Sequence, residues 1–319
     1  MFLRKYKSIL MITAVVLLAG VVSFFTYLKL HRYITWYFHE QVMQENCDQS
    51  LYFDRNDWFI TAEIYVKDNE TIDKIRYIFL DKKNEQLYEL VLDGKQWVRL
   101  YFQTPDYVQV QYMLRTLNDK NTDRTKSHCD LYKQLIYLTG VVPSNVSLIY
   151  SDKIISFQKT SLKFLWLLDH TNVKNIEITP HTAILEDGTK IDTISFNDIF
   201  SRIKDFIAID QVVNEGVLVE IYNATDKNGY ATFWSKVLNG MGFDVVRVGT
   251  LTNKNMFTGN KNNESDIKQS TFWLYIDPKV KNLESVKILK KLLGDNVYIS
   301  DTRPYGVVST ADVVIVLVR

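Results

Sequence analysis

An uncharged run near the N-terminus constrains this 319-residue chain more than any other feature. The run from Ser8 to Leu28, SILMITAVVLLAGVVSFFTYL, is about 21 residues long, enough for a helix to cross a hydrocarbon core of roughly 30 Å. The basic segment LRKYK precedes it, and the positive-inside tendency then places the N-terminus in the cytoplasm. We therefore expect residues 1–34 to form a cytoplasmic tip and a single transmembrane anchor, with the body outside the cytoplasm.

A cleaved signal peptide is the alternative interpretation of the same run. The run is longer than the apolar core of a typical signal peptide. Bulky Phe24, Phe25 and Tyr27 stand where a cleavage site with small residues would be needed. Both features favour an uncleaved anchor.

The charge of the chain is unevenly distributed. The formal net charge is +1, and five lysines and arginines lie within the first 32 residues, so the remainder carries −4. A nucleic-acid-binding groove needs a basic face. The weakly acidic body therefore argues against a nucleic-acid partner.

The segment after the anchor alternates between β-rich runs and helical patterns. We expect a juxtamembrane stalk at 35–50, with a helix or stalk over 36–47, and a mixed α/β domain at 51–212. DKKNEQ predicts the turn of a β-hairpin, and Asp187-Gly188 predicts that of a second hairpin. Strands are expected at 58–66, 75–80, 86–92, 98–102 and 146–150, and helices at 106–117, 126–138, 162–168 and 196–206.

The C-terminal region, 213–319, has the clearest pattern. From Val217 the order of elements is β-α-β-β-α-β-β. An asparagine- and lysine-rich stretch at 252–269 predicts a flexible surface loop between the two halves. This order predicts a two-layer α/β sandwich with both helices on one face of the sheet. The fold class expected for the body as a whole is α/β (α+β).

The turn NATDKNG, between the first strand and helix of this region, raises the question of a ligand site. Such a turn can hold a phosphate at a helix N-terminus, and Asn223, Thr225, Asn228 and Gly229 would supply the cradle. Asparagine and aspartate also build turns and cap helices, and glycine supplies unusual backbone angles. Neither a P-loop lysine–serine pair nor a Rossmann glycine triplet follows, so the sequence favours a structural turn.

The region from Val217 to Arg319 resembles the LytR C-terminal domain of bacterial cell-envelope proteins. The resemblance rests on NATDKNG, GFDVVRVG, TFWLYID, LLGDN and the closing strand ADVVIVLV. The family's usual Asn-Gly-Thr motif has Ala224 in place of the glycine here. Tyr230 and Phe233 replace the small residues that are usual in the first helix.

The preceding part is similar to the LytR-CpsA-Psr domain, a membrane-anchored extracytoplasmic module. YIFLDKKNEQLYELVLDGKQWVRLY is similar to its strand–hairpin–strand, and LYKQLIYLTGVVPSNVSLIY to its helix and the strand that follows. Catalytic members of that family move glycopolymers from a polyprenyl-pyrophosphate carrier onto peptidoglycan. Where the family has a Pro-Arg-Asp-Thr turn, this chain has LDGK, which keeps Asp93 and lacks the arginine.

The loss of the arginine decides which function the resemblance implies. Pyrophosphate transfer needs arginines that clamp phosphate oxygens and carboxylates that hold a metal. With Asp93 as the one weak catalytic candidate, the site would lose much of its electrostatic stabilisation. We therefore expect a non-catalytic cell-envelope protein, without metal or cofactor, that binds cell-wall glycopolymer or another envelope protein. The alternative is a glycopolymer transferase, which would need Mg²⁺ and an arginine (Arg76, Arg99 or Arg115) reaching Asp93.

The two cysteines, Cys47 and Cys129, show no Cys-x-x-Cys or His/Cys metal spacing. They could pair if the body is extracytoplasmic. Nothing in the sequence fixes their distance, so two separate thiols are expected. His128, His170 and His181 are expected to be ordinary histidines rather than metal ligands.

The predicted topology can be tested on intact spheroplasts. Because the uncharged run follows a basic N-terminus, we expect added protease to digest the body and to leave a cytoplasmic control protein intact. Protection of the body until the membrane is permeabilised would reverse the orientation.

Overall fold

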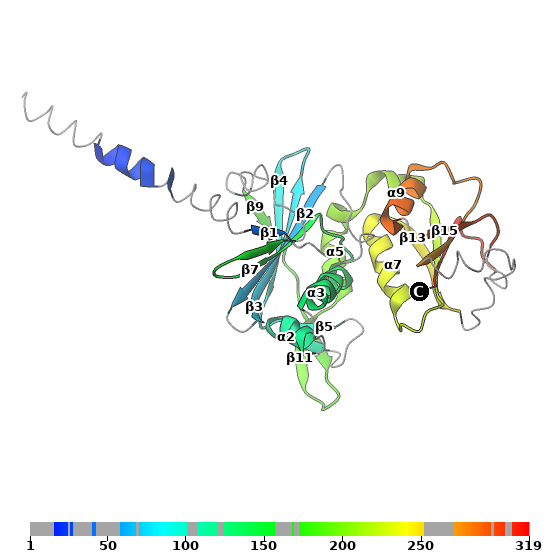
Figure 1. Cartoon of the computed structure of the whole chain (residues 1–319), viewed down its shortest axis with the longest axis horizontal. Helices are drawn as coiled ribbons and strands as arrows, with labels where there is room; N and C mark the ends of the chain where they lie inside the picture. Colours follow the sequence, from blue (N-terminus) through cyan, green and yellow to red (C-terminus); the bar gives the residue numbers. More distant parts are fainter. Residues whose placement is uncertain are drawn as a thin grey trace, which may run out of the picture.

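The computed structural model describes residues 16–24, 26–27, 40–42, 58–67, 70–100, 107–119, 124–156, 168, 172–251, 271–294, 297–303 and 308–318. These residues form three β-sheets and the helices that cover them. Two of the sheets lie in an N-terminal domain and the third in a C-terminal domain, side by side along the long axis of the molecule (Figure 1). This is a mixed α/β architecture, as the sequence predicts.

A seven-stranded mixed sheet, in the order β1-β8-β7-β2-β3-β4-β9, is the centre of the N-terminal domain. Strands β2, β3 and β4 form an antiparallel meander, which confirms the predicted β-hairpin, while β7 joins β2 in parallel and β9 joins β4 in parallel. The strands are β1 (Glu40–Val42), β2 (Trp58–Lys67), β3 (Thr71–Asp81), β4 (Gln86–Asp93), β7 (Asn145–Ile149), β8 (Ile154–Ser156) and β9 (Val173–Asn175).

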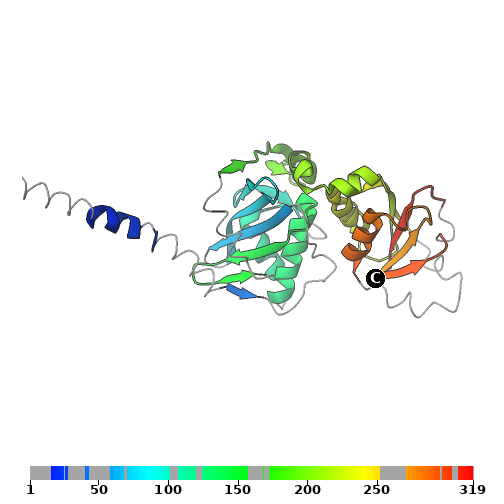
Figure 2. The ribbon, with the colours of Figure 1, turned by 90° about the horizontal axis from the view of Figure 1, so that it is seen from above.

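A small four-stranded sheet, in the order β10-β11-β5-β6, completes this domain. Its strands are β5 (Trp97–Arg99), β6 (Tyr107–Gln109), β10 (His181–Ile184) and β11 (Lys190–Ile194), and the turn at Gly188 closes the second predicted hairpin. The helices are α2 (Met113–Asn118), α3 (Arg124–Thr139) and α5 (Phe196–Ile207). Alternate strand residues such as Ile60, Ala62 and Ile64 share one buried cluster with the apolar residues of these helices. The helices therefore cover one face of the large sheet, as Figure 2 shows from above.

The C-terminal domain has a five-stranded sheet in the order β13-β12-β16-β14-β15. The chain order β12 (Leu218–Asn223), α7 (Tyr230–Met241), β13 (Asp244–Thr250), β14 (Phe272–Ile276), α9 (Glu284–Leu293), β15 (Val297–Ser300) and β16 (Val313–Leu317) is the predicted β-α-β-β-α-β-β. Val219, Ile221 and Leu274 point toward the helices, whereas Tyr222 and Trp273 lie in a separate cluster. Both helices thus cover the same face.

The two domains meet through α3, α5 and α7. Gly140 ends α3 with φ +71°, and a side-chain carbon there would lie 2.9 Å from the carbonyl oxygen of Lys236. A side-chain carbon at Gly240, on α7, would overlap the carbonyl oxygen of Gly140. The short linker helix α6 (Asp210–Glu215) begins beside α7, because the amide of Ile209 donates to the carbonyl oxygen of Met241 at 3.0 Å. One buried apolar cluster therefore extends through both domains.

The structure corrects two of the expected elements. The helix predicted at 106–117 is wrong in its first half: Tyr107–Gln109 is strand β6, and a 3₁₀ turn, Val110–Tyr112, precedes the short α2. Val108 is buried and pairs with Val98 of β5, and Val110, at the start of the 3₁₀ turn, is also buried, with its amide donating to the carbonyl oxygen of Gln96 at 2.9 Å. Within the expected stalk, Glu40–Val42 is strand β1, bonded in parallel to β8, so a continuous helix over 36–47 is wrong.

Some predictions fall mainly outside the described residues. The loop at 252–269 and most of the segment 162–168 lie there, although Leu168 is described and is buried. Of the predicted anchor, 16–24 and 26–27 are helical. Within the described stretches, none of the helices combines the length and the apolar character that a membrane span requires.

Cys129 on α3 is disulfide-bonded. The sequence holds one other cysteine, Cys47, which lies outside the described residues. Because there is no third cysteine in the chain, Cys47 is the partner available within it. The expectation of two separate thiols is therefore wrong, and it failed because the pairing depends on a distance in space that the sequence does not give.

Removing this bond should destabilise the protein. Replacing both cysteines with serine is expected to lower the free energy of unfolding by about 2–4 kcal/mol, because the bond restricts the unfolded chain across a long loop. Urea denaturation measures the loss, and the wild type under reducing conditions should match the double variant. A loss below about 1 kcal/mol would mean that the bond contributes little.

Glu215, the last residue of α6, caps helix α9 of the C-terminal domain. Its carboxylate accepts the amide of Ser285 at 2.8 Å and that of Glu284 at 3.2 Å, and the side-chain amide of Gln211 donates to it at 2.9 Å. Leu283, at the N-cap position itself, has no side-chain acceptor. Burial alone would raise the pKa of Glu215, but these hydrogen bonds outweigh it and lower the pKa to about 2.

The cap predicts a pH-dependent loss of stability in Glu215→Gln. The folded-state pKa lies below the unfolded value, so the carboxylate stabilises the fold above about pH 4.5 and loses its effect as the pH falls toward 2. We expect the variant to be about 1 kcal/mol less stable at pH 7, since the site is partly exposed. The difference should close at about pH 2. Glu284→Gln, on the exposed side of the same turn, is the control, and a pH-independent difference would contradict the capping role.

Candidate functional site

The face of the large N-terminal sheet turned away from α2, α3 and α5, the outer face, carries charged side chains in mid-strand. In β2, Glu63 and Tyr65 alternate with Ala62 and Ile64, which pack under the helices. Glu63 is only 1% exposed. A buried carboxylate is costly unless it is paired, so its neighbours decide what this face can do.

Arg76 on β3 is the partner of this carboxylate. The strand register places Arg76 opposite Glu63, and its Nη1 lies 3.3 Å from Glu63 Oε2. Its Nε and Nη2 donate to the two oxygens of Glu89 on β4 at 2.7 and 2.9 Å, a bidentate pair. The hydroxyl of Tyr65 also donates to Glu63 Oε2 at 2.8 Å, which leaves Glu63 Oε1 without a hydrogen-bond partner.

The electrostatics of Arg76 follow from these contacts. Burial by itself lowers the pKa of Arg76, but the hydrogen bond with Glu89 and the charges of Glu63 and Glu89 outweigh it and raise the pKa above its ordinary value. Arg76 is therefore permanently charged. Its Nε, Nη1 and Nη2 groups all donate to carboxylates of the protein itself, those of Glu63 and Glu89.

Asp93, the weak catalytic candidate, ends β4 near this arginine. The register pairs Asp93 with Lys74, and Lys74 with Tyr65, so all three belong to one row on the outer face. Asp93 Oδ1 accepts the amide of Lys95 at 2.8 Å, which closes the turn after the strand. Among the described residues, no ion pair joins Asp93 to an arginine. The structure brings Asp93 and Arg76 onto one face, but the guanidinium group of Arg76 contacts Glu63 and Glu89.

We call six residues of the outer face together the polar stripe: Glu63, Tyr65, Lys74, Arg76, Glu89 and Asp93. Its net charge does not suit the binding of a pyrophosphate. It carries three carboxylates and two cations, a net charge of −1 from the residues Glu63, Lys74, Arg76, Glu89 and Asp93. A diphosphate group needs an excess of fixed cations in a site that excludes water. The arrangement suits the internal neutralisation of Arg76 better than the binding of an anion.

A pocket of about 950 Å³ opens at the end of the same strands and shares Tyr65 with the polar stripe. Lys74 lies 4.8 Å from the centre of the Tyr65 ring, and Lys153 lies 5.2 Å from that of Tyr150. The described lining combines two lysines with three carboxylates, so it has no excess of positive charge: Tyr65, Val66, Lys67, Glu70, Asp73, His128, Ile149, Tyr150, Ser151, Asp152, Lys153 and Ile155. The pocket is polar and mixed in charge.

The turn at 223–229 is held by its own side chains. Asn223 Oδ1 accepts the amide of Thr225 at 3.0 Å and its hydroxyl at 2.7 Å, while Asn223 Nδ2 donates to the carbonyl oxygen of Lys227 at 2.7 Å. Gly229, at φ +76°, starts α7 without a side-chain cap, and Asn228 is exposed. The polar groups of Asn223 and Thr225 are thus used in building the turn, and a ligand role for these four residues stays a prediction.

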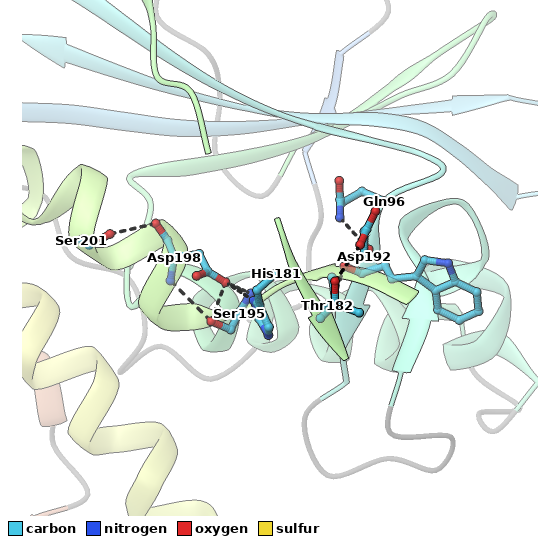
Figure 3. A network of polar contacts seen from close by, with 9 residues as sticks. Gln96, His181, Thr182, Asp192, Ser195, Asp198 and Ser201 are labelled. Atoms are coloured by element: carbon cyan, nitrogen blue, oxygen red, sulfur yellow. Dashed lines mark hydrogen bonds and ion pairs between the residues drawn. The ribbon is translucent and has the colours of Figure 1, made fainter. Parts of the chain in front are cut away.

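A serine, an aspartate and a histidine also meet at the start of α5 (Figure 3). Asp198 Oδ2 accepts from the Ser195 hydroxyl at 2.7 Å and lies 2.8 Å from His181 Nδ1. The aspartate thus stands between the other two, whereas nucleophilic catalysis needs the histidine next to the serine. Ser195 and Asp198 instead form a capping box for α5. Nearby, Gln96 donates to the carbonyl oxygen of Asp192, which ties β11 to the turn before β5.

The remaining predicted residues do not gather into a site. His181 bonds to Asp198, His128 lines the pocket, and His170 lies outside the described residues. Within the described ranges, no group of three or more His, Cys, Asp or Glu side chains is placed to hold a metal ion. Sequence reasoning missed Glu63 and Glu89; the available signal was a charged residue in the middle of each of two β-rich runs.

Comparisons with known protein families match the C-terminal domain. Residues 216–319 match the family LytR_C, described as "LytR cell envelope-related transcriptional attenuator". This match confirms the resemblance predicted for the C-terminal domain. No curated protein matches the chain as a relative.

Solved structures similar to this one include members of the LytR-CpsA-Psr family. The family protein YwtF (TagT), with bound octaprenyl pyrophosphate lipid, is 7% identical with a TM-score of 0.38, covering 52% of this chain and 97% of its own. TagT of B. subtilis is 6% identical with a TM-score of 0.35, covering 50% and 95%. TagV of B. subtilis is 8% identical with a TM-score of 0.34, covering 48% and 97%.

The polar stripe predicts that Arg76 is a structural residue. Arg76→Met leaves the buried carboxylate of Glu63 and the partly buried carboxylate of Glu89 without their cation, and should cost about 3–5 kcal/mol of unfolding free energy in urea denaturation. Replacing Glu63 and Glu89 with leucine in the same chain should recover most of that loss. Arg115→Met is the control on α2. A loss below about 1 kcal/mol in Arg76→Met would show that the arginine is free for another role.

Proposed function

We propose, from the LytR C-terminal domain at residues 216–319, that this protein is a membrane-anchored, extracytoplasmic cell-envelope protein that is not a catalyst. It binds cell-wall glycopolymer or another envelope protein. The observation that carries the non-catalytic part is the neutralised Arg76 of the polar stripe.

The proposed location rests on two independent features. The uncharged run at 8–28 follows a basic N-terminus, as in a single-pass protein whose body lies outside the cytoplasm. Cys129 is disulfide-bonded, and such bonds persist in oxidising compartments and are rare in the cytosol. The family description of the C-terminal domain also refers to the cell envelope.

The proposed lack of catalysis rests on charge. A transferase that uses a pyrophosphate-linked donor must hold several negative charges in its transition state. On the outer face Arg76 is engaged by Glu63 and Glu89, and Asp93 is engaged by its own turn. Lys74, which pairs with Asp93, lies over the ring of Tyr65. A lysine presents a point charge and lacks the planar fork that grips a phosphate.

The binding function can be tested with the purified ectodomain. We expect it to co-sediment with purified cell walls, and the bound fraction to fall at least several-fold after chemical removal of the phosphate-linked polymers. Binding that persists on stripped walls would point to peptidoglycan itself. Retention by neither preparation would contradict the polymer proposal and leave an envelope protein as the partner.

The lack of catalysis gives a second test. The ectodomain should transfer no glycan from a polyprenyl-pyrophosphate donor to peptidoglycan, with or without Mg²⁺. Asp93→Ala should leave function in cells intact. Asp187→Ala is the matched control, because Asp187 accepts the amide of Thr189 at 2.9 Å in a similar turn. Metal-dependent turnover that disappears in Asp93→Ala, and not in Asp187→Ala, would establish the transferase alternative.

A further inference from the structure

Helix α9 presents lysines on the side that faces solvent. Its buried residues, which belong to the same core cluster as the five-stranded sheet, are Val286, Leu289, Leu292 and Leu293. Lys287 and Lys291 lie on the opposite side of the helix and are exposed, while Lys290 lies at its flank and is partly exposed. Side chains three and four residues apart on a helix are neighbours, so these three lysines form one group.

The segment before α9 adds two further lysines. The amide of Val280 donates to the carbonyl oxygen of Asp277 at 3.0 Å, and the amide of Leu283 donates to that of Val280 at 2.9 Å. These bonds wind the chain into consecutive turns, in which Val280 and Leu283 pack against the core. Lys279 and Lys281 alternate with them and are exposed. Hydrogen bonds thus hold these two lysines beside the start of α9, of which Leu283 is the N-cap residue.

We call five residues together the basic face: Lys279, Lys281, Lys287, Lys290 and Lys291. The sequence 279–291 contains one carboxylate, Glu284, so five lysines less one glutamate give it a net charge of +4, although the whole chain carries +1. The described carboxylates next to it are already engaged: Asp277 lies 3.7 Å from Arg303, and Glu215 accepts the first two amides of α9. The basic face therefore has an excess of positive charge.

The protein itself neutralises the basic face only weakly. Glu284 lies 2.9 Å from Lys287, but the pair is exposed, and such pairs contribute little. In the part of the chain that the structure describes, no ion pair joins Lys279, Lys281 or Lys290 to a carboxylate. The polar stripe differs, because two carboxylates hold its arginine. Neighbouring ammonium groups repel one another, so an anionic ligand that lies along them would lower the free energy of the folded protein.

We propose that the basic face binds an anionic polymer whose repeating units are joined by phosphodiesters. The proposal rests on the proposed function, since it names the surface that holds the wall polymer and the charge that this polymer carries. An exposed lysine is a mobile point charge, so each one attracts a phosphate in many orientations and none encloses a single phosphate. Affinity then comes from several weak contacts along one polymer chain, which favours a polymer over a free phosphate.

The position of α9 in the molecule favours a wall polymer over the headgroups of the protein's own membrane. The helix at 16–24 and the C-terminal domain lie at opposite ends of the molecule in both Figure 1 and Figure 2. With the chain anchored through the run that contains this helix, as proposed, the N-terminal domain would stand between the membrane and α9. Attraction between exposed charges fades beyond about 8 Å at physiological ionic strength.

The test measures binding of the whole ectodomain to poly(glycerol phosphate) by titration calorimetry. Glycerophosphoglycerol, a single diester unit, should bind at least about tenfold more weakly per phosphate, because one contact replaces several. The Kd of the polymer should rise at least about tenfold between ~50 and ~300 mM sodium chloride, because binding releases counterions. Vesicles of phosphatidylglycerol offer the same diester on a membrane surface, and tighter binding to them than to the polymer would overturn the assignment to a polymer.

A triple variant, Lys279→Gln with Lys281→Gln and Lys290→Gln, removes the three charges that form no ion pair. The Kd for poly(glycerol phosphate) should rise at least about tenfold in this variant. Lys279 and Lys281 are exposed, so their replacement leaves the core intact. If the triple variant fails to fold, the double variant at these two positions carries the comparison, with an expected rise of at least about threefold.

The matched control removes the same charge from the N-terminal domain. Lys83, Lys190 and Lys204 are exposed there, and replacing all three with glutamine changes the net charge of the chain by the same amount. The Kd for the polymer should then change less than about twofold, because these lysines lie outside the basic face. A control variant that binds as weakly as the triple variant would reduce the effect to net charge and overturn the proposal.

Co-sedimentation with purified cell walls separates this proposal from the proposed function. Wild type and triple variant that sediment equally with walls would leave the proposed function standing and show that the basic face is not the site. Conversely, a wild type that binds poly(glycerol phosphate) through the basic face and is not retained by walls would support the face and contradict the proposed function. The proposal is also overturned if the triple variant binds the soluble polymer as tightly as the wild type, or if the wild type does not bind it.

Discussion

The contact between two glycines, Gly140 at the end of α3 and Gly240 in α7, sets the arrangement of everything else. A side-chain carbon at either position would meet the backbone of the other domain. This closeness lets α7 pack against α3 and α5 and merges the two apolar cores into one. It also brings Lys236 over the rings of Tyr137 and Phe196. The LytR C-terminal domain is therefore joined to its neighbour by a packed interface, with the linker helix α6 bonded to it at Met241 and Ser285.

The seven-stranded and the five-stranded sheet each pair a buried glutamate with a tyrosine and an arginine. Each buries a glutamate on the face away from its helices, and a tyrosine two residues further along the same strand donates to it at 2.8 Å. The pairs are Glu63 with Tyr65 and Glu220 with Tyr222. An arginine on a neighbouring strand completes each group: Arg76 lies at 3.3 Å, and Arg247 more loosely at 3.9 Å. Groups whose charges are paired within the protein in this way leave little charge for a ligand.

The candidate site shows where sequence reasoning fails. Asp93 was identified through the resemblance to the LytR-CpsA-Psr family, at the position of its Pro-Arg-Asp-Thr turn, and the structure puts it on the same face as Arg76. Whether that arginine serves Asp93 depended on Glu63 and Glu89, which come from other strands at a separation of 13 residues each in sequence. Strand register, set by pairing in space, decides which charges are neighbours. The disulfide of Cys129 and the position of Lys236 over the rings of Tyr137 and Phe196 depend on three-dimensional distances in the same way.

The sequence by itself determined the local elements and the identity of the C-terminal domain. Hydrophobic periodicity and glycine positions gave the β3–β4 hairpin, α3, α5 and the order of elements from β12 to β16, because these depend on neighbours along the chain. It misassigned 107–109, where pairing with β5 overrode a helical pattern. Only the tertiary structure decided which charges meet and which cysteine is bonded. Those outcomes depend on contacts between residues far apart in the sequence, and the periodicity of a single segment does not encode them.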